Sequence, residues 1–317
     1  MTPRRILLVA TMRDEGPFIP EWVAFHRAIG FTDILVCTND CADGSPLLLD
    51  RMARLGLLTH LRSTPSTPRE AQIVAYTLAA AHPLAAAADW AMVLDADEIL
   101  NVHVGDGSVG ALVDAVPGAT AICVNWRLFG SSGHERWSSD LVTERFTRAA
   151  PLAHGVNWPY KTLFTRLDAY GCKLLSHYPR FPKPDALAGL RYVDGGGRAL
   201  PSWYFDESRD GFLQSEPGTV DWRLAQVNHY NTRSRDDYFA KHRRGGGIPV
   251  DWDREGCWPV FDRNEEVDTT IAAKLPAMKR ALAAMREDRE LVALHARCCA
   301  LYGEYVARLK AEAALPA

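Results

Sequence analysis

Residues 90–98 read Trp90-Ala91-Met92-Val93-Leu94-Asp95-Ala96-Asp97-Glu98, an apolar run that ends in a cluster of carboxylates. Its first five residues are apolar, which predicts a strand that is buried on both faces, as the strands of a parallel sheet are. Its last four residues carry three carboxylates at the point where that strand ends. Ligands of open α/β sheets bind at the carboxyl ends of the strands, so Asp95 and Asp97 lie where such a sheet would meet its substrate.

The first hundred residues alternate short apolar runs with helical patterns, which is typical of a doubly wound α/β sheet. Gly30 and Gly56 follow two of the helical runs, at positions where glycine commonly ends a helix. The expected strands cover 6–10, 33–37, 57–61 and 90–94, and the expected helices cover 20–29, 48–55 and 73–81.

The rest of the chain is less regular. One more strand is expected over 120–126, and the aromatic region from 129 to 221, interrupted by Gly and Pro, is of the kind that often builds substrate sites. Ser234 and Asp237 have the spacing of a capping box and predict a short basic helix. One or two long amphipathic helices are expected over 274–314. The predicted domains are one α/β domain over 1–247, with two halves (1–125 and 126–247), and a C-terminal loop and helical extension over 248–317.

The composition excludes several classes of protein. With 317 residues, of which 47% are hydrophobic, the chain has the makeup of a globular protein. Its 36 basic and 39 acidic residues leave a formal charge of -3, without the cationic field that drives non-specific binding of nucleic acid. Nucleic acid is therefore not an expected partner.

Cysteine usage and hydropathy indicate the compartment. The seven cysteines are scattered without a CxxC spacing, which predicts neither a zinc site nor a disulfide framework and favours a reducing cytosol. No apolar stretch reaches the roughly 20 residues that a membrane-spanning helix needs. We therefore expect a cytoplasmic protein with at most peripheral contact to the inner face of the membrane.

The carboxylates at the strand end suggest a metal site. Asp95 and Asp97 are two residues apart, so both can reach one hard cation as the strand turns into a loop. Such a cation, Mn²⁺ or Mg²⁺, can bridge two phosphates and offset the charge that builds on a departing nucleoside diphosphate. The same Asp-x-Asp pattern also fits a helix N-cap with a solvated neighbour, so the pattern alone leaves both interpretations open.

The segments around this motif carry a family resemblance. Residues 12–26, 39–45 and 94–98, in this order, resemble the family-2-like glycosyltransferases of the GT-A fold. Residues 126–134 and 228–245 are similar to the branch of that superfamily that includes family 92. The resemblance spans residues 5–247, which a chance Asp-x-Asp would not produce. It implies an α/β fold, with a Rossmann-like, mostly parallel sheet and flanking helices, and a nucleotide-sugar donor.

The resemblance also implies roles for individual residues. In the family, the loop after the first strand and the turn after the second hold the nucleoside, which points here to Arg13, Glu15, Asn39 and Asp43. Family-2 enzymes usually carry a paired Asp where this chain has Thr38-Asn39, a departure that leaves the identity of the nucleoside open.

Two polar residues precede the strand that carries the Asp-x-Asp motif. Arg69 and Gln72 open the helix before that strand and are candidates for contacting the donor sugar or its diphosphate. The alternative is that both simply belong to a solvated first turn of the helix.

The segment from His229 to Arg244 supplies further candidates. Many GT-A enzymes add a C-terminal His to the metal ligands, so His229 is a candidate third ligand, and neutral imidazole suits Mn²⁺. A hydrogen-bonded structural His is the alternative. Lys241, Arg243 and Arg244 are expected to clamp the diphosphate, as cations commonly do with anionic leaving groups. Their alternative is an exposed helix face on which Asp237 pairs with Lys241.

The acceptor side is the least defined. If transfer inverts the anomeric centre, a carboxylate must take the proton of the acceptor hydroxyl, and Glu135 and Asp140 are the candidates for that base. The sequence thus predicts a metal-dependent glycosyltransferase that uses a UDP- or GDP-linked sugar and a glycan, lipid-linked or other acceptor. The alternatives are a nucleotidyltransferase, whose usual Gly-rich loop is absent after the first strand, and an inactive nucleotide-sugar-binding protein.

Overall fold

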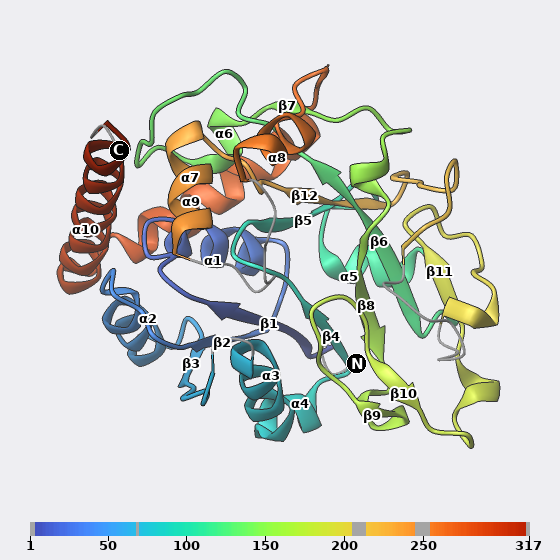
Figure 1. Ribbon diagram of the computed structural model, residues 1–317. Helices are drawn as coiled ribbons and strands as arrows, with labels where there is room; N and C mark the ends of the chain where they lie inside the picture. The colour runs from blue at the N-terminus through green and yellow to red at the C-terminus, as the bar shows by residue number, and fades with distance from the viewer. Residues whose placement is uncertain (1–3, 68–69, 205–213, 245–253, 315–317) are drawn as a thin grey trace.

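One nine-stranded sheet forms the centre of the molecule (Figure 1). The computed structural model describes residues 4–67, 70–204, 214–244 and 254–314. Across the sheet the strands follow the order β3 (Thr59–Arg62), β2 (Asp33–Thr38), β1 (Ile6–Met12), β4 (Trp90–Val93), β8 (Tyr160–Thr165), β6 (Ala121–Leu128), β12 (Ala225–His229) and β5 (Glu98–Val102), with β11 (Tyr192–Asp194) also paired to β6.

The direction of the strands is mixed but mostly parallel, which confirms the predicted fold class. Strands β3, β2, β1 and β4 are parallel to one another, as the apolar runs of the first hundred residues indicate. Strand β8 runs antiparallel between β4 and β6, and β5 runs antiparallel to β12. Neither β8 nor β5 is expected from the sequence, because β8 falls in the region taken as irregular and β5 begins at the last residue of the acidic motif.

Helices cover both faces of the sheet. They are α1 (Ile19–Ala28), α2 (Ser45–Arg54), α3 (Ala71–Ala81), α4 (Pro83–Ala87), α5 (Val109–Asp114), α6 (Val142–Arg145), α7 (Arg235–Arg243), α8 (Arg254–Phe261), α9 (Leu275–Met285) and α10 (Arg289–Ala314). Helices α1 and α9 cover one face, and α3 and α4 cover the other (Figure 1). Side chains of β1 alternate between these faces: Leu8 packs with residues of α1, α2 and α9, whereas Leu7 packs with residues of α3 and α4. The sheet is thus buried on both sides.

The region from 129 to 221 contains more regular structure than its sequence indicates. Besides β8 and β11 it includes β9 (Tyr170–Cys172), which pairs with β10 (Arg180–Pro182), and β7 (Arg148–Ala149), which pairs with β13 (Glu266–Val267). The expectation of an irregular region is therefore wrong for these segments, which are too short for a periodic pattern to be visible.

The C-terminal helices pack onto the sheet domain. The segment 274–314 forms two helices, of which α9 packs on α1 and α10 packs on α2 and α7. Met278, Leu282 and Met285 of α9 belong to the same buried cluster as Trp22 and Phe25 of α1. None of the helices in the described ranges is long and apolar enough to span a membrane.

Shortening a side chain of α9 is expected to destabilise the whole fold. Met278 is fully buried, so Met278→Ala should lower the free energy of unfolding by about 2–5 kcal/mol, measured by urea denaturation. The control is Val292→Ala on α10, where the side chain is 42% exposed and the change should stay within about 0.5 kcal/mol. Equal effects of the two substitutions would show that α9 does not stabilise the core.

Candidate functional site

The carboxyl ends of three parallel strands bring three loops to one edge of the sheet. Strand β1 lies between β2 and β4, and the register pairs Val9 with both Leu35 and Val93. The loops that follow these strands, 13–18, 39–44 and 94–97, therefore start next to one another. The carboxyl end of β12, which runs in the same direction as these strands, lies at the same edge, because His229 pairs with Glu98 and the N–H of Tyr230 donates to the carbonyl of Asp97 at 2.8 Å.

Asp97 is the carboxylate on which separate parts of the chain converge. It is buried, and its Oδ2 accepts a hydrogen bond from the ammonium of Lys241 on α7 and lies 3.5 Å from Nε2 of His229. Burial alone would raise the pKa of Asp97, but the charge of Lys241 and the hydrogen bond with His229 outweigh burial and hold that pKa well below its usual value. Asp97 is therefore an anion at neutral pH, as a metal ligand must be.

Asp95 forms an ion pair with Lys161, a residue that the sequence analysis does not predict to be part of the site. The ammonium of Lys161 on β8 is fully buried and lies 2.8 Å from Oδ2 of Asp95 and 3.0 Å from Oε2 of Glu98. It also donates to the carbonyl of Ser176 at 2.7 Å. The signal available in the sequence is that Lys161 is the one charged residue of an otherwise uncharged strand, Tyr160-Lys161-Thr162-Leu163-Phe164-Thr165.

The three charges below the site depend on one another. Burial lowers the pKa of Lys161, but Asp95 and Glu98 more than reverse that effect and raise it, so the ammonium stays protonated. Burial raises the pKa of Glu98 although Lys161 opposes this. The N–H of Asp95 donates to Oε2 of Glu98 at 2.8 Å, which closes the turn between β4 and β5.

Glu15, in the loop after β1, forms ion pairs with two arginines, Arg233 and Arg244. It is buried and accepts hydrogen bonds from Arg233 at 3.1 Å and from Arg244. The guanidinium of Arg233 also donates to the carbonyl of Ala96 at 3.2 Å and lies 3.6 Å from the ring centroid of Phe18. Arg233 was not predicted, because nothing in its sequence neighbourhood shows that it will lie over the loop after β1.

The turn after β2 is tied to the loop after β1 by carboxylates. Asp43 accepts hydrogen bonds from the N–H groups of Gly16 at 2.6 Å and Ser45 at 2.9 Å, and Asp14 accepts one from Ala42 at 2.6 Å. These bonds give both carboxylates a structural use, since they hold the two loops together. Asn39 is buried beside them and donates to Asp40 at 3.0 Å.

An aromatic side chain lies beside the candidate metal ligands. The ring of Trp126 packs on His229 with centroids 4.2 Å apart and on His177 with centroids 5.5 Å apart. The pKa of His177 is lowered to about 3 by burial and by the charge of Lys161. Nδ1 of His229 is buried without a hydrogen-bond partner, so this imidazole has an unused nitrogen.

The donor set of Asp95, Asp97 and His229 fits a divalent cation chemically, because carboxylate oxygens and a neutral imidazole suit Mn²⁺. Within the described ranges, both aspartates use Oδ2 for their ion pairs, and no hydrogen bond or ion pair involves Oδ1 of either. The ligand atoms of these three residues do not all lie within 4.8 Å of one another. Three ligand atoms lie within 4.8 Å of one another, among the residues that the structure describes, at Asp14, Cys41 and Asp43 instead.

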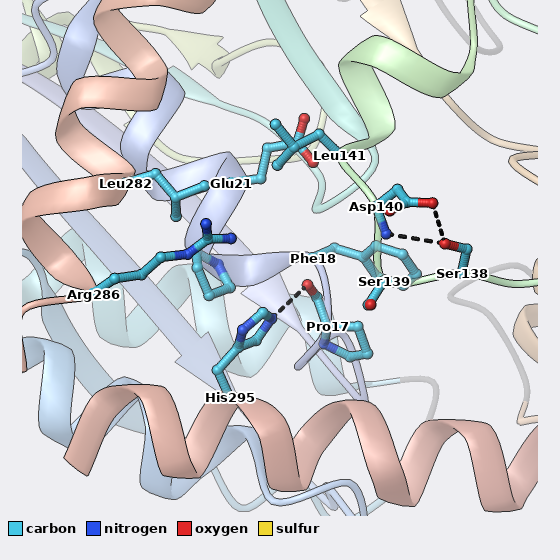
Figure 2. A pocket seen from close by; sticks show the side chains of 11 residues that line it. Pro17, Phe18, Glu21, Ser138, Ser139, Asp140, Leu141, Leu282, Arg286 and His295 are labelled. Atoms are coloured by element: carbon cyan, nitrogen blue, oxygen red, sulfur yellow. Dashed lines mark hydrogen bonds between the residues drawn. The ribbon is translucent and has the colours of Figure 1, made fainter. Parts of the chain in front are cut away.

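The two candidate bases lie away from this cluster. Glu135 is 69% exposed and its nearest cation is Arg235 at 3.7 Å. Asp140 is exposed and lines a hollow between the start of α1, α9 and α10, together with Glu21, Arg286 and His295 (Figure 2). Across the part of the chain described here, neither carboxylate contacts Asp95, Asp97 or His229. The structure therefore does not assemble these residues with the metal candidates.

The remaining predicted residues have separate positions. Arg13 lies in the loop after β1, with its side chain 38% exposed and 3.8 Å from Asp14. Gln72 lies at the start of α3 and is half-buried, and Arg243 is exposed near the end of α7. Arg69 lies outside the described residues. The exposed helix face considered as an alternative fits Arg243 but not Lys241, whose partner is Asp97.

Comparisons with known proteins give structural neighbours only. No protein-family model matches the chain, and no curated protein matches its sequence. The crystal structure of S. aureus TarS 1-349 aligns over 97% of this chain and 92% of its own, with 11% identity and a TM-score of 0.37. The same TarS segment in complex with UDP aligns over the same shares, with 10% identity and a TM-score of 0.35. The mannosyltransferase Ktr4p from S. cerevisiae aligns over 41% of both chains, with 8% identity and a TM-score of 0.26.

Removing the buried ammonium of Lys161 is expected to lower the free energy of unfolding of the protein. Lys161→Met keeps the length of the side chain but leaves Asp95 and Glu98 without their cation, at a cost of about 3–5 kcal/mol in the free energy of unfolding. Lys161 lowers the pKa of Glu98 against the effect of burial, so its loss raises that pKa further. The stability of the variant then falls more than that of the wild type as the pH rises from the pKa of the unfolded carboxyl through this higher pKa of the folded state. The loss in Lys161→Met should therefore be larger at pH 8 than at pH 5.

A second substitution provides the control. Glu98→Gln in the Lys161→Met background removes one of the two unpaired charges and should recover part of the lost stability and weaken its pH dependence. No recovery, or the same loss at both pH values, would show that the ion pairs do not cause the effect.

Proposed function

We propose that this protein is a metal-dependent glycosyltransferase that moves a sugar from a UDP- or GDP-linked donor to a hydroxyl of a glycan, lipid-linked or other acceptor. The observation that carries the proposal is the setting of Asp97. This ionised carboxylate lies at the carboxyl end of a central strand, two residues after Asp95, and meets His229 and Lys241 from two other elements. That combination suits a cation and a diphosphate bound side by side.

Asp95, Asp97 and His229 are the residues that would hold Mn²⁺ or Mg²⁺. When bound, the ion supplies Lewis-acid stabilisation of the departing nucleoside diphosphate. Lys241 and Arg244 lie on the far side of the same loops, where their charges can stabilise the phosphates. Arg244 pairs with Glu15 in the loop after β1. In this proposal Glu15 therefore orients the guanidinium of Arg244 and also lines the nucleoside site.

In this proposal the nucleoside lies over the loops after β1 and β2. Arg13 is the exposed cation of that surface, and Asn39 lies beside it on the turn after β2. Asp43 supports this surface by holding the N–H groups of Gly16 and Ser45. Gln72 and Arg69 remain candidates for the donor sugar.

In this proposal the acceptor lies next to Trp126. This residue is partly exposed and its indole packs on His229, so a sugar ring against its exposed part would be close to the metal ligands. Glu135 and Asp140 remain the candidates for the base of an inverting transfer. They belong to the segment 130–141, which follows β6 directly.

A screen of nucleotide sugars by thermal shift tests the proposal. One intact donor should raise the unfolding temperature in the presence of Mn²⁺, since a ligand at a hundred times its dissociation constant stabilises the folded state by about 2.7 kcal/mol. The same donor without Mn²⁺ should give a much smaller shift. If no donor shifts the protein under either condition, the proposed function is wrong. Transfer of the sugar to an acceptor then distinguishes an enzyme from an inactive binder.

The aspartates provide matched variants for this screen. Asp97→Asn should abolish the Mn²⁺-dependent part of the shift, because the amide keeps the shape of the side chain and removes its charge. Asp114→Asn, whose carboxylate is 64% exposed and pairs with Arg4, should behave as the wild type. A full shift retained in Asp97→Asn would mean that the metal is not bound at this carboxylate.

The role of His229 is a separate prediction. If its imidazole is a metal ligand, His229→Ala should weaken Mn²⁺ binding in the presence of the donor at least about tenfold, as loss of supporting residues does at other metal sites. Calorimetry measures this affinity, and circular dichroism checks that the chain remains folded. Unchanged affinity would assign His229 to packing against Trp126 alone.

A further inference from the structure

The ion pairs around Asp97 balance without any added ion. Four carboxylates and four basic side chains form three groups of ion pairs there, one around Asp97, one around Asp95 and Glu98, and one around Glu15. They are Glu15, Asp95, Asp97 and Glu98 on one side and Lys161, Arg233, Lys241 and Arg244 on the other. A divalent cation alone would leave this cluster with an excess of positive charge, and a diphosphate alone would leave it with an excess of negative charge. Together they nearly cancel.

The two lysines of the cluster differ in how firmly they are held. Lys161 is 0% exposed, and its ammonium has acceptors from Asp95, Glu98 and Ser176, so all three of its N–H groups are used. Lys241 is 28% exposed, and its ammonium has two acceptors within the described residues, Oδ2 of Asp97 and Oδ1 of Asn231 at 2.7 Å. Lys161 is therefore fixed, whereas the ammonium of Lys241 can exchange its partner.

We propose that Lys241 is an exchangeable counter-ion of Asp97. Without ligand it neutralises Asp97; when a divalent cation reaches Asp97, the ammonium moves from the carboxylate to the diphosphate of the donor. This inference rests on the proposed function and adds to it a coupling between two ligands. Because Lys241 opposes the cation alone and attracts the diphosphate, the metal and the nucleotide each increase the affinity of the protein for the other.

The geometry supports movement of the head group with the helix in place. Lys241 lies on α7, whose first turn is closed by a capping box between Ser234 and Asp237. Tyr302 of α10 donates to Asp237 at 2.9 Å and holds that turn against the C-terminal helix. The flexible four-carbon stem of lysine allows its ammonium to change partner without any change in the backbone.

Binding of Mn²⁺ and of nucleoside diphosphates to Lys241→Met tests the exchange. Free Mn²⁺ is followed by its electron paramagnetic resonance signal, and UDP and GDP are each titrated by calorimetry, with and without Mn²⁺. Solution binding of Mn²⁺ to the nucleotide is measured separately and subtracted. In the wild type, the better of the two nucleotides should raise the affinity for Mn²⁺ about tenfold or more, within the usual range of coupling between sites.

The variant should change the two affinities in opposite directions. Lys241→Met should bind Mn²⁺ alone about tenfold more tightly than the wild type, because no ammonium competes for Asp97, and should bind the nucleotide about tenfold more weakly in the presence of Mn²⁺. Lys310→Met is the control. Lys310 lies on α10, and its substitution breaks a lysine–aspartate pair with Asp236, which lies on α7 like Lys241. It should leave both affinities unchanged.

Other outcomes overturn the inference in distinguishable ways. If Lys241→Met binds Mn²⁺ alone no more tightly than the wild type, while the wild type binds nucleotide with Mn²⁺, the exchange is wrong and the proposed function stands. Parallel loss of both affinities would make Lys241 a support of Asp97 and would also overturn the exchange. If the wild type binds neither nucleotide under any condition, the proposed function fails and the exchange fails with it.

Discussion

A buried ammonium group fixes the geometry on which the site depends. An unpaired charge in the interior costs several kcal/mol, so Lys161 must lie where Asp95, Glu98 and the carbonyl of Ser176 can all reach it. That requirement holds β8 against the end of β4 and orients both carboxylates of the turn that leads into β5. The antiparallel insertion of β8 between β4 and β6 is therefore coupled to the site as well as to the sheet. A parallel sheet without β8 would leave Asp95 with no partner below it.

The sequence predicts those parts of the fold whose physical signal is local. Strands β1, β2 and β4 are continuous apolar runs, and the helices between them have one apolar face, so their positions follow from periodicity. Strand β8 has no such signal, because its lysine is satisfied by residues more than sixty positions earlier in the chain. Strand β5 is not predicted from the sequence because its first residue, Glu98, resembles the end of an acidic loop although it is fully buried. In both strands the buried charge is paired with a residue far away in the sequence, so the local sequence gives no sign of that partner.

The same distinction applies to the site. The sequence names Asp97, His229, Lys241, Glu15 and Arg244, and the structure brings them close together. Glu15, Asp97 and His229 follow or end strands of the sheet, and helix α7 brings Lys241 and Arg244 to the same loops. Lys161 and Arg233 were missed because tertiary pairing alone gives them a role. Glu135 and Asp140 were chosen only for lying in the segment after β6, and no contact in the described chain joins them to the cluster. Their role as bases remains a prediction.

The C-terminal helix shapes the electrostatics of the site without contributing a charge to the cluster. Tyr302 of α10 donates to Asp237, which fixes the helix that carries Lys241. The same ring packs on Phe18 at 5.6 Å between centroids, and Phe18 in turn supports the guanidinium of Arg233 at 3.6 Å. Two of the four cations around Asp97 are thus positioned through one tyrosine. The segment predicted as a C-terminal extension therefore also supports the site, because its Tyr302 contacts both the helix that carries Lys241 and the ring under Arg233.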